Sequence, residues 1–124
     1  MNDESILSNV KLLCGISGDI NDFDTPIILH CNTVFAGLTQ MGLGPSTGFY
    51  IVDNTNLWSD IIVGEVNLHN IKSYVYLKVK MLFDPPANAT LVKSMETQID
   101  ELEWRIRFEL EQMALENVVE EVIV

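Results

Sequence analysis

Two histidines are the side chains of this sequence best suited to bind a metal ion or to transfer protons. His30 and His69 lie far apart in the chain, and neither belongs to the spacing of His, Cys and carboxylate residues that zinc sites use. His30 falls beside the apolar stripe of a predicted helix, where a histidine usually forms a hydrogen bond at the edge of the core. We therefore expect no metal site.

Carboxylates are abundant, with 18 acidic residues among 124. Asp100 with Glu103, and Glu116 with Glu120, have the i,i+3 and i,i+4 spacings that place two side chains on one helix face. Both pairs fall on a solvated face, where no apolar surroundings raise a carboxyl pKa for acid–base catalysis. No serine has a nucleophile-elbow context, and the glycine-rich segment Gly42–Ser46 lacks the lysine of a phosphate loop. The sequence thus predicts neither an enzyme nor a cofactor.

The charge balance narrows the range of partners. The formal net charge is −11 and the isoelectric point is near 4.3, whereas proteins that bind nucleic acid or anionic membranes cluster Lys and Arg. We interpret Lys72, Lys78 and Lys80 as side chains whose aliphatic stems lie along a buried helix. Cys14 and Cys31 are expected to be buried free thiols.

The cellular location is inferred from two absences. No apolar run approaches the roughly 20 residues that cross a bilayer. The acidic start Met1–Glu4 is unlike the basic start of a secretory signal, so we expect assembly in the cytoplasm and no membrane partner.

Four helices and one irregular connection account for the sequence. Helices are predicted at about 3–16, from Pro26 to Gly42 with Asp24 or Thr25 as the N-cap, from Asn67 to Phe83, and at about 88–118. The third is apolar around most of its circumference and ends before two prolines, so it must be buried. Residues 44–65 are expected to form a long loop or a short β element at Phe49–Val52. Residues 56–63 are expected to form a short helical turn in which Trp58, Ile61 and Ile62 face inward.

The fourth predicted helix carries two apolar stripes. The first is suited to the core and contains Leu91, Met95, Ile99, Leu102, Ile106, Leu110 and Met113. The second, which contains Trp104, Phe108 and Leu115, lies on a different face and is assigned to a neighbouring molecule. We thus expect a mainly α, four-helix bundle-like domain over residues 1–116.

The last residues, 117–124, are rich in β-branched side chains that disfavour helix. They are expected to form an extended C-terminal arm that contains Val118, Val119, Val122, Ile123 and Val124.

Several blocks occur in an order that is familiar from one protein family. They are Asp22–Phe35, Gln40–Pro45, Trp58–Asp60, Tyr74–Pro86 with its Leu-Phe-Asp-Pro-Pro ending, and Glu101–Arg105. In these blocks the chain resembles the head–tail connector proteins, also called adaptor or head-completion proteins, of tailed phages and of prophages in Gram-positive bacteria. Two departures are Cys31, where an aliphatic residue is expected, and the length of chain that follows Arg105.

The resemblance implies a ring of about twelve copies beneath the portal, in the neck of the virion between capsid and tail. Such a ring extends the DNA channel, lets DNA pass without specific binding, and offers a docking surface to the tail, a stopper or a tail-terminator protein. On this basis we assign the stripe with Trp104, Phe108 and Leu115 to the subunit interface and the arm to the portal. The loop residues assigned to the tail side or the lumen are Phe49, Tyr50, Ile51 and Trp58.

Three other interpretations remain open from the sequence. The first is a tail-completion or tail-terminator ring, which assembles with the tail tube. The second is a small acidic cytoplasmic protein that imitates the charge of DNA, although the acids surround a helix that also carries two apolar stripes. The third is a helical domain with no assignable function.

Overall fold

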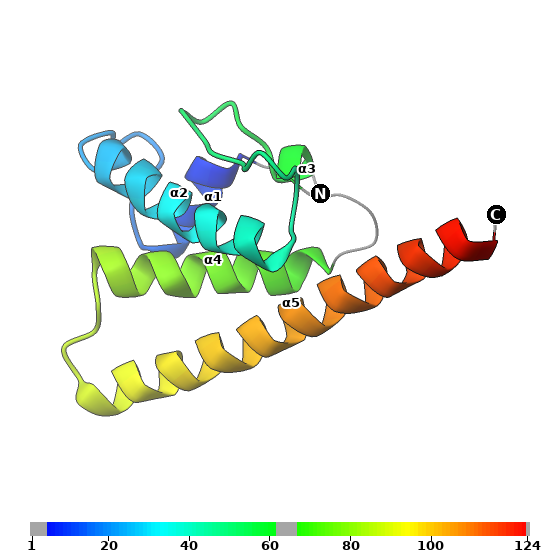
Figure 1. Ribbon diagram of the computed structural model, residues 1–124. Helices are drawn as coiled ribbons and strands as arrows, with labels where there is room; N and C mark the ends of the chain where they lie inside the picture. The colour runs from blue at the N-terminus through cyan, green and yellow to red at the C-terminus, as the bar shows by residue number, and fades with distance from the viewer. Residues whose placement is uncertain (1–4, 62–66, 124) are drawn as a thin grey trace.

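A computed structural model describes the backbone of residues 5–61 and 67–123, and the side chains of residues 5–61 and 67–116. Its helices are α1 (Ile6–Leu13), α2 (Asp24–Met41), α3 (Trp58–Ile61), α4 (Leu68–Phe83) and α5 (Ala89–Ile123), shown in Figure 1. Within these ranges the only β feature is an isolated bridge between Ser5 and Leu57. The prediction of a mainly helical bundle is confirmed.

The central element is α4, with α2 packed against one side and α5 against the other (Figure 1). Its buried side chains are Ile71, Tyr74, Val75, Leu77 and Val79. Cover on two sides explains why the sequence of this helix is apolar around most of its circumference. The Asn67 side chain caps the helix by accepting hydrogen bonds from the backbone N–H groups of His69 and Asn70, at 3.0 and 3.3 Å.

The principal stripe of α5 was assigned to the core, and in the structure it packs against α4. Its buried members are Met95, Ile99, Leu102, Ile106 and Leu110. Leu91 is exposed because α5 diverges from α4 toward the turn that joins them (Figure 1). Near the other end of the pair, a Glu109 carboxylate oxygen accepts a hydrogen bond of 2.7 Å from the backbone N–H of Asn67.

The N-terminus of α2 differs from its prediction. The helix begins at Asp24, and Phe23 occupies the N-cap without a side-chain hydrogen bond, so the predicted N-cap is wrong. Pro26 still lies in the first turn, where backbone N–H groups have no partner within the helix and their loss costs little. The Asp24 carboxylate instead pairs with the Lys11 ammonium at 2.8 Å. The predicted stop at Gly42, with φ of 110°, is confirmed.

The C-terminal segment is helical, which corrects the extended arm expected there. α5 continues to Ile123, and Val124 lies outside the described residues. A β-branched residue costs a helix only a few tenths of a kcal/mol relative to alanine. Because each added residue also gains a backbone hydrogen bond, a helix that is already formed extends through such residues. The end of α5 projects past the other helices (Figure 1).

Phe49–Val52, in the connection between α2 and α4, is part of a loop rather than a β strand. The Asn32 side chain accepts a hydrogen bond from Ile51 N–H at 2.7 Å and donates one to Ile51 C=O at 3.0 Å. These two bonds satisfy the backbone of Ile51 as a neighbouring strand would. The Phe49 ring also packs edge-on against Phe35, with centroids 5.1 Å apart.

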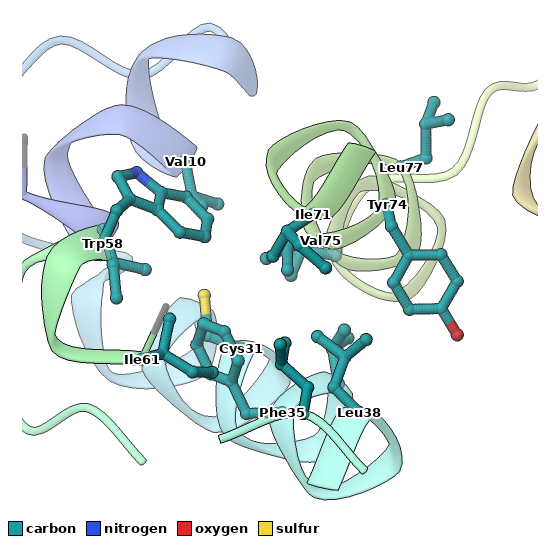
Figure 2. Close-up of a cluster of buried hydrophobic side chains, with 14 of the residues drawn as sticks. Val10, Cys31, Phe35, Leu38, Trp58, Ile61, Ile71, Tyr74, Val75 and Leu77 are labelled. Carbon is teal, nitrogen blue, oxygen red and sulfur yellow. The ribbon is translucent and has the colours of Figure 1, made fainter. Parts of the chain in front are cut away.

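The short helix α3 closes the core. Figure 2 shows Trp58 and Ile61 pointing toward Cys31 and Phe35 of α2. The side chains of Trp58 and Ile61 are fully buried, which confirms the prediction that they face inward. Ile62, for which the same orientation was expected, lies outside the described residues.

Candidate subunit interface

The outer face of α5 presents the three apolar side chains assigned to a neighbouring molecule. Trp104, Phe108 and Leu115 are 66%, 50% and 58% exposed. Their spacing of four and then seven residues keeps them on one side of the helix, opposite the buried Leu102 and Ile106. The rings of Trp104 and Phe108 stack with centroids 5.5 Å apart and planes 12° from parallel. The stack forms a flat aromatic surface at the middle of the long helix.

Charged side chains border this aromatic surface. Glu101 and Glu111 are exposed one turn before Trp104 and one turn after Phe108. Arg105, exposed beside Trp104, offsets one of these charges, whereas the guanidinium of Arg107 pairs with Glu103 of the same helix at 3.0 Å. An aromatic centre with a charged rim is the usual composition of a protein–protein contact.

The four loop residues assigned to the tail side or the lumen separate into two groups. Ile51 and Trp58 are buried and Phe49 is half-buried, so these three hold the loop to the domain. Tyr50 is 67% exposed, and Val52, which the sequence analysis did not select, is exposed beside it. Tyr50 and Val52 are therefore the large apolar side chains of the described loop that are exposed enough to contact another protein.

The arm residues have a defined backbone only. Residues 117–123 continue α5, whereas the side chains of Val118, Val119, Val122, Ile123 and Val124 lie outside the described residues. The helix places the segment at the far end of α5 from the turn at residues 84–88.

The described residues that are suited to chemistry lie apart from one another. His30 is half-buried and lies edge-on to the Phe83 ring at 6.5 Å. Burial raises the pKa of the Cys31 thiol to about 12, so this residue is a packing group rather than a nucleophile. Among the described residues, no group of three or more His, Cys, Asp and Glu side chains could hold a metal ion.

The lysines of α4 lie as predicted, with their stems on the helix surface. The Lys72 ammonium lies over the Trp58 ring and that of Lys78 over the Tyr74 ring, each 5.8 Å from the centroid. All three lysines of this helix are half-buried, and Lys80 pairs with Asp84 at 2.8 Å. In the part of the chain that the structure describes, no helix is long and apolar enough to span a membrane.

One comparison with known proteins finds a match. The family model described as phage connector protein matches residues 6–113. The match begins at the first residue of α1 and ends at Met113, the last residue of the α5 stripe that faces α4. It includes Trp104 and Phe108 but neither Leu115 nor residues 117–124. No curated protein and no solved structure matches the chain.

Proposed function

The chain belongs to the phage connector protein family, and from this we propose that it is a head–tail connector that forms a ring of about twelve copies beneath the portal. The family is a structural one and gives the chain a connector-type role in the phage particle. In the proposal the ring extends the DNA channel in the neck. Its lower surface receives a stopper or tail-terminator protein, and assembly takes place in the host cytoplasm.

The exposed stack of Trp104 and Phe108 is the main observation that supports assembly into a ring. Two large aromatic side chains in water favour association, because burying them gains roughly 1.5–3 kcal/mol each. They lie on the outer face of a helix whose inner face is already packed on α4. We therefore keep Trp104, Phe108 and Leu115 as the proposed subunit interface.

The acidic charge supports the proposed path of DNA. At −11 per copy, a ring repels the phosphate backbone and offers few lysines or arginines to neutralise it. DNA then passes along the channel without a specific binding site.

We propose that the end of α5, residues 117–124, docks onto the portal. Because residues 117–123 are helical, the fitting mode is a helix that lies in an apolar groove, in place of the strand addition an extended arm would use. The residues assigned to this contact are Val118, Val119, Val122, Ile123 and Val124. The loop with Tyr50 is assigned to the tail side or the lumen.

The copy number in purified virions tests the role in the particle. Quantitative mass spectrometry should give parity with the portal protein, about twelve copies of each. A ratio near one half or one quarter would move the ring into the tail and favour a tail-completion protein. Absence from the particle would contradict a structural role.

Removal of residues 117–124 tests the portal contact separately. The shortened chain should lose binding to purified portal and keep its self-association, because Trp104 and Phe108 remain. Trp104→Ala is the matched control, since it should weaken self-association and leave each copy its portal-binding segment. If the shortened chain still bound the portal, the proposed role of residues 117–124 in portal docking would be contradicted.

A further inference from the structure

The outer face of α2 is free of charge in a strongly acidic protein. Asp24 is the only acidic residue of this helix, which contains no Lys or Arg, and Asp24 is paired with Lys11. The exposed side chains of α2 are Thr25, Leu29, Thr33, Ala36 and Gln40. An uncharged exposed helix face is unexpected where the net charge is −11.

Removing water from this α2 face costs little free energy. Leu29 is 64% exposed, and the Thr33 hydroxyl donates a hydrogen bond of 3.0 Å to the Leu29 carbonyl of its own helix. The hydroxyl therefore keeps a partner when water leaves. Tyr50 and Val52 extend the apolar surface along one edge, because Asn32 of α2 holds Ile51 between them.

The α2 face and the aromatic stripe of α5 point in opposite directions. α2 and α5 pack on opposite sides of α4, so their outer faces lie on opposite sides of the molecule (Figure 1). Leu29 and Gln40 are eleven positions apart, as are Trp104 and Leu115, which corresponds to about 16 Å along each helix. The two stripes therefore match in length.

We propose that the stripe of Trp104, Phe108 and Leu115 in one copy docks on the α2 face of the next copy. The inference rests on the ring assembly proposed above and names the receiving surface. Contact between two different faces is heterologous, and a heterologous contact continues from copy to copy until the ring closes.

Charge and shape favour a second copy of this chain as the occupant of the α2 face. The border of the aromatic stripe is net acidic, because Glu101 and Glu111 outnumber Arg105, and it disfavours an acidic partner surface, whereas the α2 face carries no acid to oppose it. The side chains at the middle of the α2 face, Thr33 and Ala36, are small, so the rings of Trp104 and Phe108 can approach that helix closely.

Single substitutions test the two faces. Ala36→Glu places a carboxylate in the middle of the α2 face at an exposed position, and it should weaken self-association at least tenfold in sedimentation experiments. Gln98→Glu is the matched control: it adds the same charge at an exposed position of α5 about 120° around the helix from Trp104, and it should associate like the unmodified chain. Circular dichroism verifies that each variant keeps its helices.

A mixing experiment tests whether the contact is heterologous. Ala36→Glu keeps an intact α5 stripe, and Trp104→Ala keeps an intact α2 face. Equal amounts of the two should form a heterodimer that grows no further, because only one productive contact can form.

Normal association of Ala36→Glu would overturn the assignment of the α2 face and leave the ring proposal standing. An unmodified chain that stays monomeric at its highest soluble concentration would overturn both the contact and ring assembly in solution. Absence from virions together with the expected heterodimer would instead contradict the connector role alone.

Discussion

Lys11 is a buried lysine that the sequence analysis did not predict. It follows Val10 of the apolar α1 stripe, and its side chain is only 4% exposed. Its ammonium pairs with the Asp24 carboxylate, which is 26% exposed, and this pair ties α1 to the start of α2. A helix at the start of the chain was predictable from its periodicity, but the pair depends on how two helices meet and leaves no local pattern.

Lys11→Met should lower the free energy of unfolding by roughly 2–3 kcal/mol, because it leaves a half-buried carboxylate without its cation. The value lies below that of a fully buried pair since water still reaches Asp24. Urea denaturation followed by circular dichroism measures the change.

The control for this variant is Lys80→Met, which breaks the more exposed pair with Asp84 and should cost less than about 1 kcal/mol. The double variant Lys11→Met, Asp24→Asn should regain part of the loss, because no charge is left unpaired. Equal effects of the two single substitutions would mean that the pair contributes nothing beyond a surface contact.

Among the elements, the loop after α2 depends on one side chain. Asn32 forms both hydrogen bonds to the buried residue Ile51, and through them it places Tyr50 and Val52 beside α2. A strand was one of the two predicted forms of this segment, because Phe49–Val52 has a β-prone composition. The two bonds join residues 19 positions apart, so no local signal could favour the loop over the strand.

Asn32→Ala should reduce the free energy of unfolding by roughly 2–3 kcal/mol, because it leaves the N–H and C=O groups of a buried residue without partners. Thermal unfolding measures the effect. Asn54→Ala, an exposed amide of the same loop, should change stability by less than about 0.5 kcal/mol. If the two variants unfolded at the same temperature, the buried side chains of the loop, and not the Asn32 hydrogen bonds, would hold it in place.

The long helices were the most predictable elements, for a physical reason. α4 has a capping Asn67, a two-sided apolar pattern and a stop at Pro85, and α5 has a buried stripe that repeats over many turns. Helix ends were less predictable: Phe23 gives no side-chain cap to α2, and α5 continues through residues that disfavour helix. The exposure of Trp104 and Phe108 followed from their angle to the buried stripe. The uncharged α2 face became apparent only when the fold placed it opposite to them.

At the scale of the whole molecule, net charge opposes assembly. Each copy has a formal net charge of −11, so copies repel one another before they are close enough to form the proposed contact. The apolar stripe of α5 acts only when copies touch, and salt does not weaken it.

Self-association should therefore strengthen as salt is added. From about 10 mM to about 1 M ionic strength the Debye length falls from about 30 Å to about 3 Å, which removes the repulsion between copies. The average mass in sedimentation equilibrium, at fixed protein concentration, should rise over this range. Glu111→Lys should make the rise smaller, since it lowers the charge beside the aromatic stripe. Dissociation on adding salt would mean that ion pairs hold the copies together.

The unequal connections on the two sides of α4 have a kinetic consequence. Residues 84–88 connect α4 to α5, whereas the longer segment 42–67 connects α2 to α4. The loss of chain entropy on closing the longer connection costs about 1.5 kcal/mol more free energy. The hairpin of α4 and α5 is therefore expected to form by the rate-limiting step of folding, and α1 and α2 to dock afterwards. Ile106→Val should then slow refolding in stopped-flow measurements, whereas Ile27→Val should mainly accelerate unfolding. The aromatic stripe would accordingly be presented to other copies before the α2 face that is proposed to receive it.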